Sequence, residues 1–226
     1  MTDVKSSSRK ERAARTRGAI IRAATEEFRT GGYHGTTMAA IARRAEVAVQ
    51  TVYFVFHTKA ALLTAAIDTA VMGEEDPVPP ELTPWWREGT TTNDGRRAVE
   101  LFVTNVATIL ARSATLDRVV LSAATTDPEI SDVIAHHDAL QVRGYRSYVD
   151  PLATRGLLKH GLDPAEATDV LLTLVGSDVF LNLTEQRRWP TDRYIRWTTD
   201  TLCALILERP TTADVAPHLD VAEPDR

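Results

Sequence analysis

The sequence has one cysteine in 226 residues, Cys203. A single cysteine excludes an intrachain disulfide framework and a cysteine-based zinc site. No run of about 18 apolar residues occurs, and the polar, basic N-terminus lacks the apolar stretch of a secretory signal. We therefore expect no membrane partner and a cytoplasmic protein.

Common catalytic motifs are also missing. The chain has no glycine-rich phosphate loop, no nucleophile elbow and no histidine pair at metal-ligand spacing. His136 and His137 are adjacent, so on a helix their side chains diverge by about 100° and do not share a metal. We predict no cofactor, no metal and no catalytic residue. An all-α enzyme using Asp138, His137 and Asp178 for acid-base chemistry stays open as an alternative.

Charge is divided unevenly along the chain, whose net charge is −5. Residues 1–72 contain 11 basic and 6 acidic side chains, whereas the remainder contains 15 and 25. A basic segment joined to an acidic one is typical of a protein in which only the first segment meets a polyanion such as DNA. A solvated basic helix or tail would give the same composition.

The apolar residues recur at helical spacing and show no strand-like alternation, which predicts an all-α fold. Proline and aspartate at 127–128 and 163–164 mark expected helix starts, and Gly31-Gly32 marks a stop. Four short N-terminal helices precede longer ones, expected over 96–112, 116–126, 128–159, 164–188 and 191–209. We predict a flexible basic tail (1–13), an N-terminal helix-turn-helix domain (14–74), a linker or loop (75–95), a larger helical ligand-binding and dimerisation domain (96–209) and a disordered tail (210–226).

Residues 37–56, TMAAIARRAEVAVQTVYFVF, have the spacing of a helix-turn-helix. Such a motif needs small or apolar residues at fixed offsets, and it leaves one face of its second helix free for the major groove. The inward positions are Ile41, Ala42, Ala45, Val47, Val52 and Val55.

The longer run GYHGTTMAAIARRAEVAVQTVYFVFHTKAALL resembles the N-terminal signature of the TetR family of one-component transcriptional regulators. The resemblance covers residues 14–74, and the later helices match the family only in number and order. The family usually carries glycine in the turn, where this chain has Glu46. A left-handed backbone at this non-glycine residue would cost roughly 1 kcal/mol.

The resemblance implies DNA contacts at the starts of the second and fourth helices and on the exposed face of the third. Gln50 has the carboxamide that pairs with adenine, and Val49 can pack on a thymine methyl group. Tyr53 and Lys59 are expected as phosphate anchors; the alternative for Tyr53 is a core aromatic, although Phe54 and Phe56 already offer apolar bulk for the core. The predicted DNA contacts are Thr37, Arg43, Arg44, Val49, Gln50, Thr51, Tyr53 and Lys59.

The resemblance further implies a homodimer through the last two helices, a palindromic operator and a small-molecule effector that releases a repressor from DNA. The expected dimer contacts are Leu171, Leu174, Val175, Leu202, Leu205 and Ile206. The expected effector contacts are Trp85, Trp86, Phe102, Asn105, His137 and Asp178, of which Asn105 and Asp178 have interhelical hydrogen bonds as the alternative. A nonspecific, architectural DNA-binding protein stays open as a second alternative function.

Overall fold

The structure is a computed structural model that describes residues 3–73, 78–125 and 127–208. Across these ranges the regular elements are helices, and the β pairing is one isolated bridge between Leu158 and Leu207. The all-α prediction is therefore confirmed. The elements are α1 (Asp3–Gly35), α2 (Met38–Arg44), α3 (Val49–Phe56), α4 (Lys59–Met72), η1 (Pro80–Leu82), α5 (Pro84–Thr91), α6 (Gly95–Ala124), α7 (Pro128–Thr154), α8 (Pro164–Leu174), α9 (Ser177–Leu181), the π-helical η2 (Asn182–Gln186) and α10 (Thr191–Ile206).

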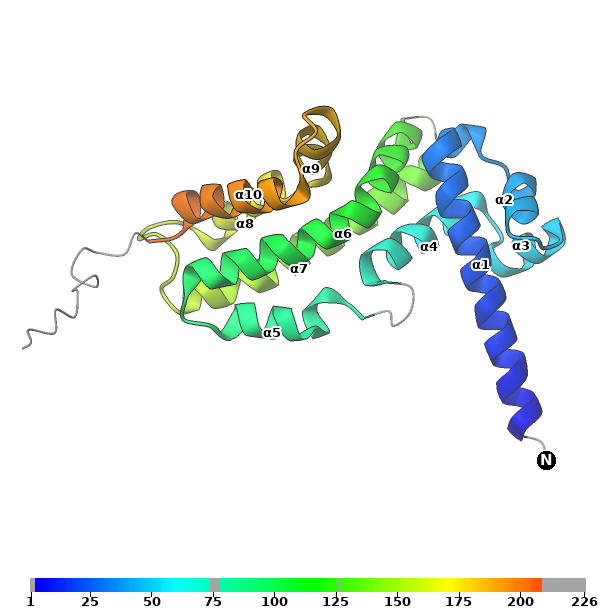
Figure 1. Ribbon diagram of the computed structural model, residues 1–226, viewed down its shortest axis with the longest axis horizontal. Coiled ribbons are helices and arrows are strands. Elements are labelled where there is room, and N and C mark those ends of the chain that lie inside the picture. The colour runs from blue at the N-terminus through cyan, green and yellow to red at the C-terminus, as the bar shows by residue number, and fades with distance from the viewer. Residues whose placement is uncertain (1–2, 74–77, 126, 209–226) are drawn as a thin grey trace, which may run out of the picture.

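Two hydrophobic cores share α6, which crosses the middle of the molecule (Figure 1). The first core joins α1–α4 and also contains Leu116, Val120 and Ala123 from the end of α6 and Ile130 from the start of α7. The second core joins the rest of α6 and α7 to α5, α8, α9 and α10. A domain boundary was expected after residue 74, but the first core also contains residues of α6 and α7 from beyond this boundary.

The N-terminal segment is helical from Asp3, in place of the flexible tail expected over 1–13. Residues 3–17 contain neither glycine nor proline and are rich in alanine, lysine and arginine, which favour helix. Helical geometry breaks at Gly32, where φ is 64°, so the stop expected at Gly31-Gly32 is confirmed.

The segment expected as a linker contains α5. Thr83 caps α5 by accepting a hydrogen bond from the Trp86 amide, and Pro84 occupies the first turn. Trp86 is buried in the second core, and at Gly89 an added Cβ would lie 1.7 Å from the Tyr148 hydroxyl. Sequence reasoning missed the signals for this helix, which are a capping threonine, a proline in the first turn and two tryptophans. Residues 74–77 and the expected tail (210–226) lie outside the described residues.

Two further helix boundaries differ from expectation. The break expected after Arg112 is absent, because Ser113 and Ala114 contain no stop signal and are buried within one continuous α6. The helix expected over 164–188 instead breaks between α8 and α9. The carbonyls of Leu174 and Val175 at this break accept hydrogen bonds from the hydroxyls of Tyr194 and Tyr145, at 3.2 and 2.9 Å.

Two segments, Gly95–Ala124 and Pro164–Gln186, reach the length and apolar composition of membrane spans. In the first, 56% of the apolar window is buried inside the fold, as expected of a helix that serves two cores. In the second, the buried share is 33%. The apolar side chains of α8 and α9 are buried or half-buried against the second core.

The turn between α2 and α3 has a left-handed residue. Glu46 has a φ of 55°, which is the left-handed backbone considered above for the position where the family usually carries glycine. The side chain is exposed, so the strain is confined to the backbone.

We expect Glu46→Gly to raise the free energy of unfolding by up to about 1 kcal/mol, because glycine relieves the strain but adds entropy to the unfolded chain. Chemical denaturation measures this gain. Glu46→Ala is the matched control, since alanine removes the same side chain and keeps the strain. Equal free energies of unfolding for Glu46→Gly and Glu46→Ala would show that the positive φ at this turn does not destabilise the fold.

A half-buried polar contact joins α4 to α7. His137 of α7 has its Nε2 atom buried without a hydrogen-bond partner, 3.9 Å from Oδ1 of Asp68 on α4. Burial lowers the pKa of His137, and the opposing effect of Asp68 is smaller. Nearby on α6, burial raises the pKa of Asp117, which accepts a hydrogen bond from the Ser177 hydroxyl.

The lowered pKa of His137 predicts a loss of stability on acidification. Below the ordinary histidine pKa of about 6.5, the unfolded chain binds a proton that the folded chain still refuses, so unfolding is favoured as the pH falls toward the folded pKa. We expect His137→Gln to weaken this dependence when melting temperatures are compared between pH 8 and 5. The exposed His160→Gln is the control, and parallel curves for wild type and His137→Gln would contradict the assignment.

Candidate nucleic-acid interface

The helix-turn-helix forms as its sequence predicts. Thr37 caps α2, with its hydroxyl oxygen accepting from the Ala40 amide at 3.1 Å. Six apolar positions were expected to face inward. Ile41, Ala42 and Val52 are fully buried, and Ala45, Val47 and Val55 pack at the edge of the first core.

The outward face of α3 has a carboxamide and two aromatic rings. Gln50 is exposed, Tyr53 is 51% exposed and Phe54 is 82% exposed. Tyr53 is therefore not a core aromatic. The interpretation of Phe54 as core bulk is wrong, because Val52 and Phe56 are the buried residues of this short helix. Phe54 and Phe56 are two residues apart, so at about 100° per residue they lie on opposite sides of the helix, and sequence reasoning missed this signal.

The remaining residues expected at DNA surround α3. Thr37 and Arg43 are exposed, while Val49 and Thr51 are partly buried, Val49 against the first core. Arg44 is exposed but pairs with Glu27 of α1, with 2.6 Å between Nε and Oε1. The end of α2 thus presents Arg43, which forms no ion pair with the described residues, and Arg44, which is already paired.

Lys59, at the start of α4, is engaged within the protein. Its ammonium donates to the carbonyls of Tyr33 and Thr36 at 2.7 and 3.0 Å and lies 4.2 Å from the centroid of the Tyr33 ring. Burial lowers its pKa. The Tyr33 hydroxyl bonds in turn to Asp127, the N-cap of α7, and burial followed by this carboxylate raises the pKa of Tyr33 to about 12. In this structure Lys59 holds the α1–α2 turn rather than pointing to solvent.

Three expected effector residues meet in an aromatic cluster between α5, α6 and α7. Trp86 and Phe102 are buried, and Trp85 packs beside them. Tyr148 touches all three, with ring centroids 4.7 Å from Phe102, 5.0 Å from Trp86 and 6.3 Å from Trp85. Its hydroxyl donates to the Ala98 carbonyl at 2.8 Å. Tyr145 and Tyr148 were missed by sequence reasoning, although their spacing of three residues places both on one helix face.

The other three expected effector residues make their contacts outside the aromatic cluster. Asn105 donates to the Leu101 carbonyl of its own helix at 2.7 Å, so the hydrogen bond is intrahelical and not the interhelical one considered. His137 faces Asp68, and the exposed Asp178 lines a separate open hollow of about 300 Å³ with Val179, Asn182, Leu183 and Trp197. Asp138 is exposed on α7, so the enzyme alternative finds no assembled acid-base group among the described contacts.

The dimer contacts expected on the last helices need correction. Four of them are buried in the chain's own second core, because the helix faces that carry them pack on α6 and α7: Leu171, Val175, Leu202 and Ile206. Leu174 is partly buried, and Leu205 is 47% exposed. The exposed apolar face of α10 also contains Trp197, which is 38% exposed.

Comparison with known proteins gives a match to the family described as bacterial regulatory proteins, tetR family, over residues 20–66. No curated protein matches the chain. The chain also shares its fold with solved structures. NalD of Pseudomonas aeruginosa, the secondary repressor of the MexAB-OprM multidrug efflux pump, is 22% identical and has a TM-score of 0.66, covering 86% of this chain and 98% of NalD.

Two other solved structures contain small molecules. SmeT in complex with triclosan is 20% identical, with a TM-score of 0.65 and coverage of 93% of this chain and 99% of SmeT. A protein of Saccharomonospora viridis in complex with choline is also 20% identical, with a TM-score of 0.65 and coverage of 85% and 98%. Residues 20–66 of this chain thus match the model of the tetR family of bacterial regulatory proteins, and the chain has the fold of these solved structures over most of its length.

Proposed function

We propose that this protein is a sequence-specific, DNA-binding transcriptional regulator that inserts α3 into the major groove. The observation that carries the proposal is the outward face of α3. Gln50, Tyr53 and Phe54 point to solvent while Val52 and Phe56 anchor the helix. Phe54 is 82% exposed and Tyr53 is 51% exposed, so this face leaves two aromatic side chains available to a partner.

Each side chain of this face has a distinct chemical role in the proposal. Gln50 reads a base edge, because a carboxamide pairs in bidentate fashion with adenine. Phe54 supplies an apolar surface for a thymine methyl group, alongside the partly buried Val49. Thr37, Arg43 and Tyr53 contact phosphates, and Thr51 contacts base or phosphate. Lys59 is a positioning residue that holds the α1–α2 turn. Arg44 is also a positioning residue, because its ion pair with Glu27 ties the end of α2 to α1.

Base reading and phosphate binding are separable by mutation. We expect Gln50→Ala to relax sequence preference at one base pair by about 1–3 kcal/mol, whereas Arg43→Ala weakens binding to all duplexes alike and lowers the salt slope by about 1. Selection of binding sites followed by competition with scrambled duplex measures both effects. Equal effects of the two variants would contradict the division of roles, and equal binding to selected and scrambled DNA would favour the architectural alternative.

We further propose a homodimer, which lets two copies of α3 read a palindromic operator. In this proposal a second copy of the chain packs on the exposed apolar face of α10. Trp197 and Leu205 are exposed at a spacing of eight residues, and the hollow beside Trp197 continues this face onto Val179 and Leu183.

A charge on this face should separate the subunits. We expect Leu205→Asp to shift sedimentation from a dimer to a monomer, because the carboxylate would be buried without a partner in the interface. Leu82→Asp is the matched control, since Leu82 is also an exposed leucine and lies on η1, away from α10. A monomeric wild type, or a dimeric Leu205→Asp protein, would contradict this interface.

The regulator is proposed to be a cytoplasmic repressor that a small molecule releases from DNA. The aromatic cluster of Trp85, Trp86, Phe102 and Tyr148 is the proposed effector site, with Asn105 one helical turn away. The rings are close-packed, so a ligand would enter by displacing Trp85, the partly buried member. NalD is a repressor and SmeT was solved with triclosan, which supports a regulator of this kind. We propose no catalytic role.

A further inference from the structure

Arg155 lies at the end of α7 and reaches across to α5. It is the C-cap residue of α7, and its Nη1 atom donates a hydrogen bond to the Thr90 carbonyl, in the last turn of α5. The Nε and Nη2 atoms of the same guanidinium are buried, and neither has a hydrogen-bond partner among the described residues. Two of the three nitrogens of a permanently charged group are therefore buried without an acceptor.

This arrangement destabilises the fold, because buried donors lose the hydrogen bonds that water would give them. The acidic side chain of α5 does not compensate, since Glu88 pairs with Arg97 of α6, with 3.0 Å between Oε1 and Nη2. The hydrogen bond to Thr90 explains one nitrogen of Arg155 as a contact that holds α5 on α7. It leaves the other two unexplained.

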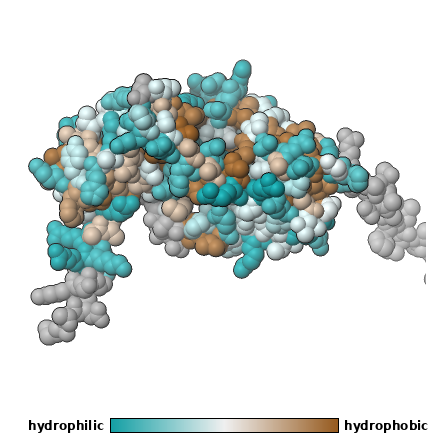
Figure 2. All heavy atoms as spheres, turned by 180° about the vertical axis from the view of Figure 1, so that it is seen from behind, coloured by the Kyte–Doolittle hydropathy of each residue, from teal (hydrophilic) through white to brown (hydrophobic). Residues whose placement is uncertain are grey.

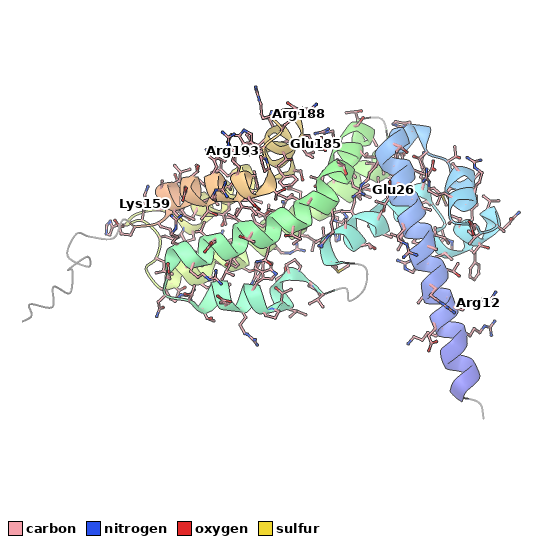
Figure 3. All side chains as sticks on the ribbon, viewed as in Figure 1. Arg12, Glu26, Lys159, Glu185, Arg188 and Arg193 are labelled. Carbon is pink, nitrogen blue, oxygen red and sulfur yellow. The ribbon has the colours of Figure 1, made fainter. Side chains whose placement is uncertain are left out.

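Other cations of the chain satisfy the corresponding atoms. The Nε and Nη2 atoms of Arg112 donate to two carbonyls in the last turn of α4, at 2.8 and 3.3 Å. Lys159, the next basic residue after Arg155 and labelled in Figure 3, donates from its ammonium to the Ala204 carbonyl of α10 at 2.5 Å. Arg112 thus binds acceptors with the two atoms that Arg155 leaves unpaired.

The unpaired side of Arg155 matches the shape of a carboxylate. The Nε–H and Nη2–H bonds of a guanidinium are nearly parallel, and together they form a fork that binds both oxygens of a carboxylate. The remaining nitrogen, Nη1, is the one that Thr90 holds. The contact with α5 therefore orients the guanidinium and leaves this fork without a partner among the described residues.

Arg155 adjoins the aromatic cluster of the proposed effector site. Tyr148 and Arg155 are seven residues apart on α7, which is two helical turns, so their side chains lie on one face. Burial raises the pKa of Tyr148, and the positive charge of Arg155 opposes this effect. On α5, the Thr90 hydroxyl donates to the Trp86 carbonyl at 2.8 Å. The same two helices thus hold the aromatic rings and the guanidinium.

The aromatic cluster provides an apolar surface beside this charge. Ring centroids are 5.4 Å apart for Trp85 and Trp86 and 4.7 Å apart for Phe102 and Tyr148. On the outer face shown in Figure 2, by contrast, hydrophilic and hydrophobic residues are interspersed. Ligand sites in proteins combine apolar walls with a few fixed polar groups, and Arg155 is such a group at the edge of this cluster.

We propose that the effector is an organic anion with an aromatic body, whose carboxylate binds the Nε and Nη2 atoms of Arg155 while its ring packs on the aromatic cluster. The inference rests on the proposed function, because it takes the cluster as the effector site, and it adds the chemical class of the ligand. Trp85 and Thr90 belong to the same short helix, so a ligand that displaces α5 at Trp85 reaches both the rings and the guanidinium.

The test compares aromatic carboxylates with their neutral amides on the full-length protein. The probes are benzoate, 3-phenylpropionate and 2-naphthoate, each with its carboxamide, and isothermal titration calorimetry measures binding. We expect wild type to bind at least one carboxylate about 10–100-fold more tightly than its amide, because the amide cannot form the charge-assisted pair of hydrogen bonds.

Three variants locate this preference. R155M removes the guanidinium and should abolish it, whereas R155K keeps the positive charge without the fork and should lose most of it. R87M is the matched control, since Arg87 is an exposed arginine on α5, and it should keep the wild-type preference. Circular dichroism verifies that each variant is folded.

The outcomes separate the two proposals. The inference is wrong if wild type prefers no carboxylate over its amide, or if folded R155M keeps the preference. If R155M does not fold, R155K decides, and an undiminished preference in R155K would overturn the role of the fork. Equal binding of wild type to operator and scrambled duplex would instead refute the proposed function and leave the carboxylate preference standing.

Discussion

The end of α6 is buried in the core of the N-terminal domain, and the rest of the structure depends on this contact. Leu116, Val120 and Ala123 complete a core that α1–α4 cannot close by themselves. Arg112 reinforces the joint, since its guanidinium donates to the carbonyls of Ala70 and Val71 at the end of α4, at 2.8 and 3.3 Å. The helix-turn-helix domain is therefore joined to the body by shared core packing and by two hydrogen bonds.

This joint gives the proposed effector site a mechanical route to α3. Phe102, in the aromatic cluster, and Leu116, in the first core, lie on the same uninterrupted helix. A displacement of α6 at the first position must be accommodated at the second, because both cores are closely packed. Tyr33, Asp127 and Lys59 form a second connection, from the start of α7 to the base of the helix-turn-helix. Effector and DNA affinities would be linked reciprocally through these contacts.

Sequence reasoning succeeded where local geometry decides. The offsets of Ile41 and Val52 follow from the helical period, and both are buried as predicted. It failed for Lys59, because a lysine at a helix start looks the same whether its ammonium meets a phosphate or the carbonyls of a neighbouring turn. It also failed for Leu202 and Ile206, since an apolar stripe does not state whether it faces its own chain or a second copy.

Local sequence by itself determined the all-α fold, the helix-turn-helix at 37–56 and the exposure of Gln50, because helical periodicity and capping act within a few residues of each position. Only the tertiary structure decided that α6 is continuous and serves two cores, that α5 packs its tryptophans on Tyr148, and that α10 turns Trp197 and Leu205 outward. These choices depend on contacts between residues far apart in the chain, and the hydrophobic effect that drives them rewards buried area without specifying the partner.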